Sequence, residues 1–441
     1  MKTWATLASL SLCLLSACSA GPKPYQNQQF ENRAEGIPPT PTSSISTRQT
    51  NDTPHLSSTA PSAYSIPEHI TRIARQSPAV QPPAEQPPAN QPPAAQPETS
   101  QPEQSSPAKV KAKSAVTVKG IYVPAWKAKG ASLSKLIGLL DRTELNAMVI
   151  DVKNDSGQIT YDSNVGLANE IGADDTKPIP DIKALLTELK GHQIYTIARV
   201  VAFKDPYLCS VRKDLAMHTK AGAVWRDRKG VAWVDPYHPD VQAYNIAIAK
   251  EAIELGFDEV QFDYVRFPEN GQKVDQEVKF YNPQGLNKSD VIQQFLTKAK
   301  QAIPAGAISA DVFGLTTSAK GDMGIGQDWG KMSPAIDYIS PMVYPSHYSS
   351  GTLGVRNPDL NPYDIIKVSM QDALEKNQQL EASGKKAAQV RPWLQDFTAK
   401  WVKPHQTYGA KQVKEQIRAA KELGIDQYLL WNPSCNYSYR D

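Results

Sequence analysis

The chain has few cysteines and no excess of charge of either sign. Only four of its 441 residues are cysteine, and 48 Lys and Arg stand against 45 Asp and Glu, a formal net charge of +3. Such a balance does not suit neutralisation of a phosphate backbone, so we expect no nucleic-acid partner. Cys13 and Cys18 lie in the first 18 residues, which leaves Cys209 and Cys435 for the rest of the chain, and their spacing does not show whether they pair.

Two motifs of common α/β enzymes are also missing. No Gly-rich phosphate turn follows the first predicted strand, where "VPAWKAKG" stands instead, which argues against a dinucleotide-binding sheet. That strand carries no His-x-His pattern, and only His347 lies just past a predicted strand, so a metal-dependent amidohydrolase barrel is not favoured. We therefore expect no cofactor and no metal.

The first residues, "MKTWATLASLSLCLLSACSAG", carry an early Lys, an apolar stretch and small residues before a cysteine. This pattern predicts a secretory signal peptide over residues 1–17. The apolar stretch is too short for a permanent membrane span, and the residues before Cys18 resemble the lipobox of bacterial lipoproteins, which implies lipidation of Cys18. Ser19 rather than Asp follows, so we expect a lipid anchor in the cell envelope, on the periplasmic side of the outer membrane. A soluble secreted protein is the alternative.

Residues 18–115 are rich in Pro, Gln, Ser and Thr and poor in large apolar side chains. Such a segment buries too little surface to offset its ordering entropy, which predicts a disordered linker. The repeat "QPPAEQPPANQPPAAQPE" favours extended polyproline II, so the linker is expected to act as a semi-rigid tether to the membrane.

Residues 116–441 alternate apolar runs of strand length with amphipathic runs of helix length, which predicts parallel βαβ units. Eight strands in about 320 residues are typical of a (β/α)8 TIM barrel, and a doubly wound open sheet is the alternative. The predicted strands are 119–126, 147–153, 194–203, 259–267, 307–314, 338–345, 389–397 and 427–433. The predicted helices include 132–142, 179–192, 239–256, 289–302 and 410–424.

Polar residues within these strands are expected to face the barrel lumen, because the surrounding helix layer accepts apolar groups. They would form a ring of polar and aromatic groups towards the carboxyl ends of the strands, where barrel enzymes carry their chemistry. The predicted inward set is Asp151, Lys153, Tyr195, Arg199, Gln261, Asp263, Ser309, Asp311, Ser340, Tyr344, Arg391, Trp393, Gln395 and Trp431.

Asp263 and Asp311 lie on consecutive predicted strands. Neighbouring strands are about 4.8 Å apart, so the two carboxyl groups are expected to approach the roughly 5 Å separation of a retaining glycosidase pair. One carboxylate would attack the anomeric carbon and the other would protonate the leaving oxygen. Nearby aromatic side chains would offer flat faces to sugar rings. The alternative is that the inward charged residues form a structural ion-pair network.

Several segments, among them "GIYVPAW", "VIDVKND", "FDEVQFDYVRFP", "SADVFG" and "YISPMVYPSHY", resemble a glycosyl hydrolase domain family of bacterial exported proteins that is related to α-amylase-type barrels. The resemblance spans Val118 to Ser438 and implies a TIM barrel with glycoside hydrolase activity. Amylase-type barrels carry a nucleophilic Asp on strand four, a Glu acid/base on strand five and a further Asp at strand seven. Asp263, Asp311 and Asp396 match these places in order.

Three departures from that pattern stand out. Asp311 replaces the usual Glu, Gln261 stands where amylases carry an Arg, and Asp396 is out of phase with its inward neighbours. The expected substrate-binding residues are Trp126, Asp151, Lys153, Arg199, Gln261, Tyr264, Arg266, Tyr344, His347, Trp393, Gln395, Trp431 and Asn432.

The sequence thus predicts a retaining glycoside hydrolase with a polysaccharide substrate, from the cell envelope or elsewhere. The alternative is a non-catalytic barrel that binds polysaccharide or peptidoglycan as a tethered adaptor, since the same aromatic and acidic groups would suit binding without turnover. A close carboxylate pair with a raised pKa on one member would favour the enzyme. Separated or salt-bridged carboxylates would favour the adaptor.

Overall fold

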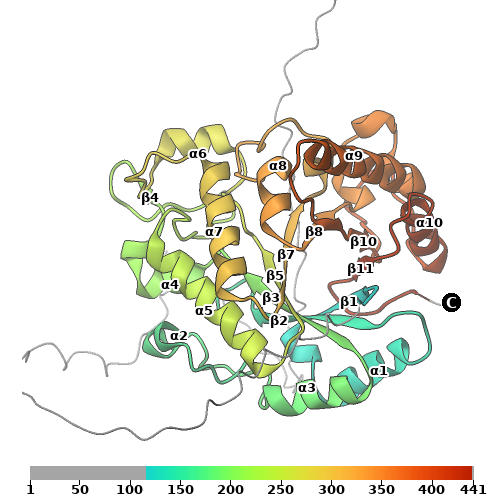
Figure 1. Ribbon diagram of the computed structural model, residues 1–441, viewed down its shortest axis with the longest axis horizontal. Coiled ribbons are helices and arrows are strands. Elements are labelled where there is room, and N and C mark those ends of the chain that lie inside the picture. The colour runs from blue at the N-terminus through green and yellow to red at the C-terminus, as the bar shows by residue number, and fades with distance from the viewer. Residues whose placement is uncertain (1–115, 440–441) are drawn as a thin grey trace, which may run out of the picture. The chain divides into compact units, whose positions relative to one another are not determined.

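The computed structural model describes residues 116–439, and in them eight parallel strands alternate with helices and close into a barrel (Figure 1). This confirms the predicted (β/α)8 fold and excludes the doubly wound sheet. The predicted signal peptide, Cys18 and the linker lie outside the described residues.

The barrel closes because the seventh strand pairs on both sides, with the sixth and with the eighth. That seventh strand is split in two at Arg391 and Pro392, where proline has no N–H to donate to the ladder. The barrel strands are β1 Lys119–Val123, β2 Ala147–Lys153, β3 Tyr195–Val201, β5 Glu259–Asp263, β7 Ala307–Phe313, β8 Tyr338–Met342, β9 Gln389–Val390 with β10 Trp393–Gln395, and β11 Tyr428–Trp431. A small antiparallel pair, β4 His218–Thr219 and β6 Val278–Lys279, lies outside the barrel.

Helices surround the strands, with α5 next to α7 and α9 next to α10 (Figure 1). Each predicted helix is present within a few residues of its expected ends. The helices are α1 Gly130–Leu140, α2 Gly166–Ile171, α3 Ile182–Gly191, α4 Pro206–Val211, α5 Pro239–Leu255, α6 Gly271–Glu277, α7 Lys288–Ala302, α8 Trp329–Met332, α9 Pro362–Ala382 and α10 Ala410–Lys421. Among residues 116–439 none of them is long and apolar enough to cross a membrane.

Local sequence signals fix where the helices begin and end. The Asp181 carboxylate accepts a hydrogen bond from Ala184 N at 2.9 Å at the start of α3, and Asp205 does the same for Leu208 N at 2.8 Å in α4. Helix α5 opens with Pro239 and is capped after Leu255 by Gly256, which adopts φ 116°. These caps set the lengths of the connections that bring each strand back into the barrel.

The core has two layers. The larger one lies between strands and helices and includes Ile150, Phe262 and Ile339, all fully buried. A smaller apolar layer inside the barrel contains Val149 and Leu429. Because the lumen is filled by side chains, only its carboxyl end is left for polar chemistry.

No helix follows β11 in the described part of the chain. Instead, the residues after it run back to β1 and to the connection before β2, where Tyr437 OH donates to Tyr122 O and Tyr439 OH donates to the Glu144 carboxylate. The two cysteines of the described region, Cys209 and Cys435, are buried free thiols.

Candidate active site

The carboxyl ends of the strands gather the polar residues. Strand register places Asp151 beside Arg199 and Arg199 beside Gln261, while Asp263 is the last residue of β5. On the next strand, the pairing of Phe262 with Ala310 leads directly to Asp263 and Asp311 as neighbours. Asp263 and Asp311 are therefore neighbours on adjacent strands, and the approach of their carboxyl groups to about 5 Å stays a prediction.

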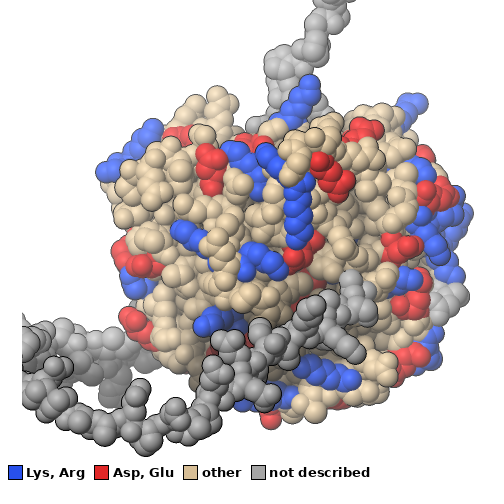
Figure 2. Space-filling model, in the orientation of Figure 1, with Lys and Arg blue, Asp and Glu red and all other residues tan. Residues whose placement is uncertain are grey.

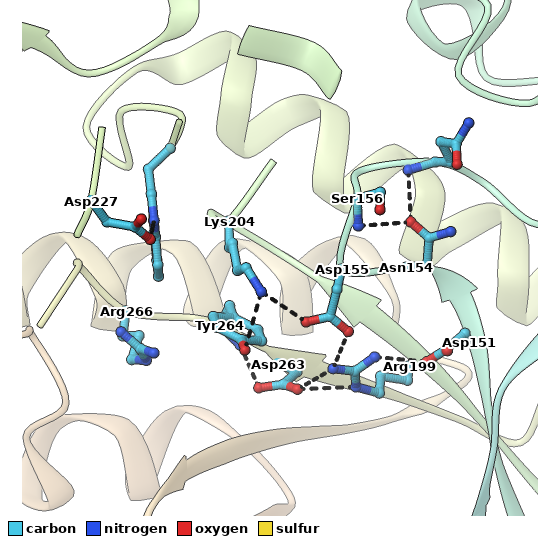
Figure 3. A network of polar contacts seen from close by, with 12 residues as sticks. Asp151, Asn154, Asp155, Ser156, Arg199, Lys204, Asp227, Asp263, Tyr264 and Arg266 are labelled. Atoms are coloured by element: carbon cyan, nitrogen blue, oxygen red, sulfur yellow. Dashed lines mark hydrogen bonds and ion pairs between the residues drawn. The ribbon is translucent and has the colours of Figure 1, made fainter. Parts of the chain in front are cut away.

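Arg199 links three carboxylates (Figure 3). Its guanidinium donates from Nε at 3.0 Å and from Nη2 at 2.5 Å to Asp263 Oδ2, and from Nη1 at 2.7 Å to Asp151 Oδ1. Nη2 also donates to Asp155 Oδ2 at 3.2 Å. The Arg199 side chain is only 2% exposed, so little water screens these contacts. The charge of the Asp263 carboxylate is thus compensated by a fixed cation.

Strand β5 stops at Asp263 because Tyr264 takes a left-handed conformation with φ 49°. This conformation is uncommon for a residue with a large side chain, and such strain concentrates at functional sites. Here it lets Tyr264 N donate to Asp263 Oδ1 at 2.6 Å, while Lys204 Nζ donates to Tyr264 OH at 3.4 Å and to Asp155 Oδ1 at 3.2 Å. The predicted strand to residue 267 is four residues too long for this reason.

The surroundings of the Asp311 carboxyl group differ from those of Asp263. Asp311 is 2% exposed, and Trp393 Nε1 donates a hydrogen bond to its Oδ1 at 2.7 Å. Burial, and then the negative charge of Asp263, raise the pKa of Asp311 well above its usual range, against the opposing effects of the Trp393 bond and the cations Arg199 and Arg391. Two neighbouring carboxyl groups thus lie in different surroundings, because Asp263 contacts the Arg199 cation while burial favours the protonated form of Asp311.

Aromatic rings face this pair from the other side of the barrel mouth. Tyr122 stacks on Trp431 with ring centroids 4.2 Å apart, and Trp431 also contacts Trp393 at 5.6 Å and Tyr344 at 6.5 Å. Tyr122 OH donates to Asp151 Oδ2 at 2.7 Å, which joins the two sides. We call Asp151, Asp155, Arg199, Asp263 and Asp311 the charged half, and Tyr122, Tyr344, Trp393 and Trp431 the aromatic half.

The family model described as "Putative glycosyl hydrolase domain" matches residues 120–437. The chain belongs to this family. The match includes every strand of the barrel except the first residue of β1.

Solved structures give weaker similarities. A hypothetical protein from Ruminiclostridium thermocellum is 39% identical, covers 44% of this chain and 97% of its own, and has a TM-score of 0.40. The spore cortex-lytic enzyme SleL of Bacillus cereus is 11% identical over 73% of this chain and 72% of its own, with a TM-score of 0.45. The α-galactosidase TtGalA of Thermus thermophilus is 9% identical over 73% and 59%, with a TM-score of 0.43. Among curated proteins no relative matches the chain.

One residue predicted to line the lumen of this glycosyl hydrolase domain does not do so. The Lys153 ammonium ion pairs with Asp205 at 2.6 Å and donates to Asn245 Oδ1 of α5 at 3.0 Å, with both charged side chains fully buried. The register of β2 shifts between Asp151 and Lys153, and this bulge turns Lys153 towards the helices. The prediction that Lys153 faces the lumen was wrong.

Deeper in the lumen, Arg391 and Glu259 form a fully buried ion pair, with the Ser309 hydroxyl also donating to Glu259. One layer above, Gln261 Nε2 donates to Ser340 Oγ at 3.2 Å. These groups form a buried structural network below the carboxylate pair. The ion-pair alternative that the sequence left open concerned Asp263 and Asp151, which are both paired with Arg199. Gln261 accordingly fills the lumen beneath Asp263.

The predicted residues at strands seven and eight secure the surrounding loops. Asp396 Oδ2 accepts a hydrogen bond from Ser438 N at 2.8 Å, and Asn432 Nδ2 donates to Asp396 O. Gln395 Oε1 accepts from Ser346 N at 3.0 Å. Asp396 therefore binds the C-terminal segment, which does not support its predicted catalytic role.

Three other predicted residues lie around the mouth. Arg266 is 3% exposed, and its guanidinium lies 4.4 Å from the ring centroid of Phe313 and 5.0 Å from that of Tyr264. His347 contacts Tyr344 at 5.3 Å between ring centroids. Trp126 is 57% exposed, and the Lys127 ammonium lies 4.6 Å from its ring centroid.

Sequence reasoning missed Tyr122, Asp155 and Lys204 as site residues. Tyr122 shares the inward phase of its strand, whereas Asp155 is the second residue after β2 and Lys204 the third after β3. Charged residues in the first few positions after each strand were the available signal. Within residues 116–439 no group of three or more His, Cys, Asp or Glu side chains is arranged to hold a metal ion.

Proposed function

We propose that the protein is a retaining O-glycoside hydrolase that acts on a polysaccharide. The observation that carries the proposal is the asymmetric pair at the barrel mouth, where Asp263 is bonded to Arg199 and its neighbour Asp311 has a raised pKa. Adjacent strands bring such groups to about the 5 Å spacing of retaining enzymes.

In the proposed reaction the Asp263 carboxylate attacks the anomeric carbon, while Asp311 transfers its proton to the departing glycosidic oxygen. The bond to the leaving group breaks as the bond to Asp263 forms. Asp311, now charged, takes a proton from a water molecule, which attacks the same carbon and releases Asp263. Arg199 orients the nucleophile throughout, and the Tyr264 N–H fixes its second oxygen.

The relationship to α-amylase-type barrels is part of this proposal. Gln261 stands where those enzymes carry an Arg two residues before the nucleophile, but Arg199 supplies a guanidinium to Asp263 from the neighbouring strand β3. The same chemical group is thus present from a different position. This supports Asp263 as the strand-four nucleophile and weakens the case for Asp396 as the third carboxylate.

The aromatic half is the proposed sugar-binding face. Sugar rings stack on flat aromatic surfaces, and the partly exposed Trp431, with Tyr122 packed against its ring, lies opposite the charged half. If Cys18 carries lipid, the barrel is held in the cell envelope, and an envelope polysaccharide is then the nearest substrate. We propose this location together with the activity.

A non-catalytic polysaccharide-binding adaptor is the second candidate, and one observation favours it. Asp263 is bonded to Arg199 as a buried ion pair would be, and the two carboxylic residues are only 7% and 2% exposed. An ion pair of this kind also suits a purely structural role.

Turnover separates the two candidates. The purified protein is incubated with peptidoglycan, amylose, chitin and other envelope and storage polysaccharides, beside the Asp263→Asn variant. Reducing ends released by the parent protein and not by the variant support the hydrolase, and NMR of the first-formed anomer tests retention. Saturable binding of a polysaccharide without any released ends would favour the adaptor.

A further inference from the structure

A line of aromatic rings continues outward from the aromatic half. Tyr344 contacts Phe397 at 5.9 Å between ring centroids, and Phe397 stacks on Trp401 at 6.1 Å with 17° between the planes. His347 touches both, at 6.2 Å and 6.5 Å. Phe397 and Trp401 belong to the loop after β10, and His347 belongs to the loop after β8. We call His347, Phe397 and Trp401 the outer platform.

The outer platform is partly exposed and uncharged. All three side chains belong to residues of intermediate burial, unlike Trp393 within the lumen, which is 1% exposed. Burial lowers the pKa of His347 to about 4, so its imidazole is neutral at physiological pH. A neutral aromatic surface that stays in contact with solvent suits the apolar face of a sugar ring.

The loop that carries the platform is held from beneath. The buried Asp359 carboxylate accepts a hydrogen bond from Gln406 N at 3.0 Å, and its carbonyl accepts one from Tyr408 OH at 3.0 Å. Tyr408 N donates to Thr398 Oγ1 at 3.0 Å, which ties the two ends of the loop together. The rings are therefore positioned before any ligand arrives, which reduces the entropy lost on binding.

We propose that the outer platform is a distal sugar-binding subsite, so that the protein binds a glycan polymer across several units and cleaves it at the carboxylate pair. This inference rests on the proposed hydrolase activity and extends it to the size of the substrate. The Tyr344 ring joins the platform to the rest of the aromatic half, since it contacts both Phe397 and Trp431.

The test compares substrates of two lengths. For the sugar that the protein hydrolyses, kcat/KM is measured on a long oligosaccharide and on a short aryl glycoside, in the parent protein and in Trp401→Ala. Loss of one aromatic contact should lower the ratio of kcat/KM on the long oligosaccharide to kcat/KM on the aryl glycoside by about fivefold to tenfold. Tyr281→Ala is the matched control, because Tyr281 is 49% exposed and contacts His238 instead, with ring centroids 4.8 Å apart. Its ratio should not change.

A binding measurement keeps the test independent of turnover. Affinities for amylose, chitohexaose and soluble peptidoglycan glycan strands are measured in the Asp263→Asn background, with and without Trp401→Ala. Weaker polymer binding by about the same factor supports the subsite even where hydrolysis is not detected. An unchanged ratio and an unchanged polymer affinity would overturn it, as would the absence of binding to every polymer. The hydrolase proposal is judged separately, on turnover by the parent protein compared with Asp263→Asn.

Discussion

Neutralising Asp263 should abolish turnover at a moderate cost in stability. The Asp263→Asn variant keeps the shape of the side chain, and its amide oxygen can still accept from Arg199. The cation is not stranded, because Asp151 Oδ1 remains 2.7 Å from Nη1 and Asp155 Oδ2 remains 3.2 Å from Nη2. The loss is therefore that of one charged hydrogen-bonding partner, about 1.5–3 kcal/mol.

The opposite change should be far more harmful to stability. Arg199→Ala leaves Asp151, Asp155 and Asp263 without their shared cation, and two of the three are almost completely buried. Removing one partner of a buried ion pair costs about 3–5 kcal/mol, and here several carboxylates lose theirs at once. We expect the melting temperature of Arg199→Ala to fall by at least twice as much as that of Asp263→Asn.

Activity and melting temperature are measured together in the parent protein and both variants. If Asp263 is the nucleophile, the Asp263→Asn variant should lose several orders of magnitude in rate with a modest shift in melting temperature. The reasoning fails if Asp263→Asn is as unstable as Arg199→Ala, because Asp263 would then be the principal structural partner of the cation. A fully active Asp263→Asn variant would refute its role as nucleophile.

Two further predictions concern other parts of the chain. Lys153→Met should lower the free energy of unfolding by about 3–5 kcal/mol in denaturant titrations, because it strands the buried Asp205 carboxylate, and adding Asp205→Asn should recover part of the loss. Since Lys153 faces the helices, the folded fraction should keep its activity, and a rate loss at full folding would return Lys153 to the site. Cys18→Ser should move the protein from the membrane fraction to the soluble fraction on cell fractionation, and unchanged membrane association would contradict the lipid anchor.

The barrel and the centre of its site were predictable because their signals are periodic. Alternation of apolar and polar residues along a strand fixes which side chains face inward, and it placed Asp151, Arg199, Asp263 and Asp311 in the lumen. The order of the strands in a closed parallel barrel then made Asp263 and Asp311 neighbours without any knowledge of the loops.

What the sequence did not show are the places where periodicity breaks. A bulge in β2 turns the Lys153 side chain from the lumen to the helices. The left-handed conformation of Tyr264 ends β5 at the candidate nucleophile, although nothing in "FDYVRF" distinguishes its residues from strand formers. Asp155 and Lys204 meet through loops whose paths depend on tertiary packing. Pairings of that kind have no signature in residue spacing.

The raised pKa of Asp311 makes stability depend on pH in a predictable direction. Above the ordinary carboxyl pKa of about 4, the unfolded chain releases this proton freely, whereas burial and the charge of Asp263 oppose its release in the folded protein. Folding stability from this group is therefore fully present below about pH 4 and falls as pH rises towards the folded-state pKa, by about 1.4 kcal/mol per pH unit within that window. Asn cannot ionise, so Asp311→Asn should lose less stability than the parent protein between pH 4 and pH 8, while its Oδ1 still accepts from Trp393.

The same variant should lose activity most on glycosides with poor leaving groups, which need a proton donor. Thermal melts across this pH range and rates on aryl glycosides of graded leaving group test both effects. A variant that melts lower than the parent protein at every pH and hydrolyses all leaving groups equally well would show that Asp311 supports the fold and is not the acid.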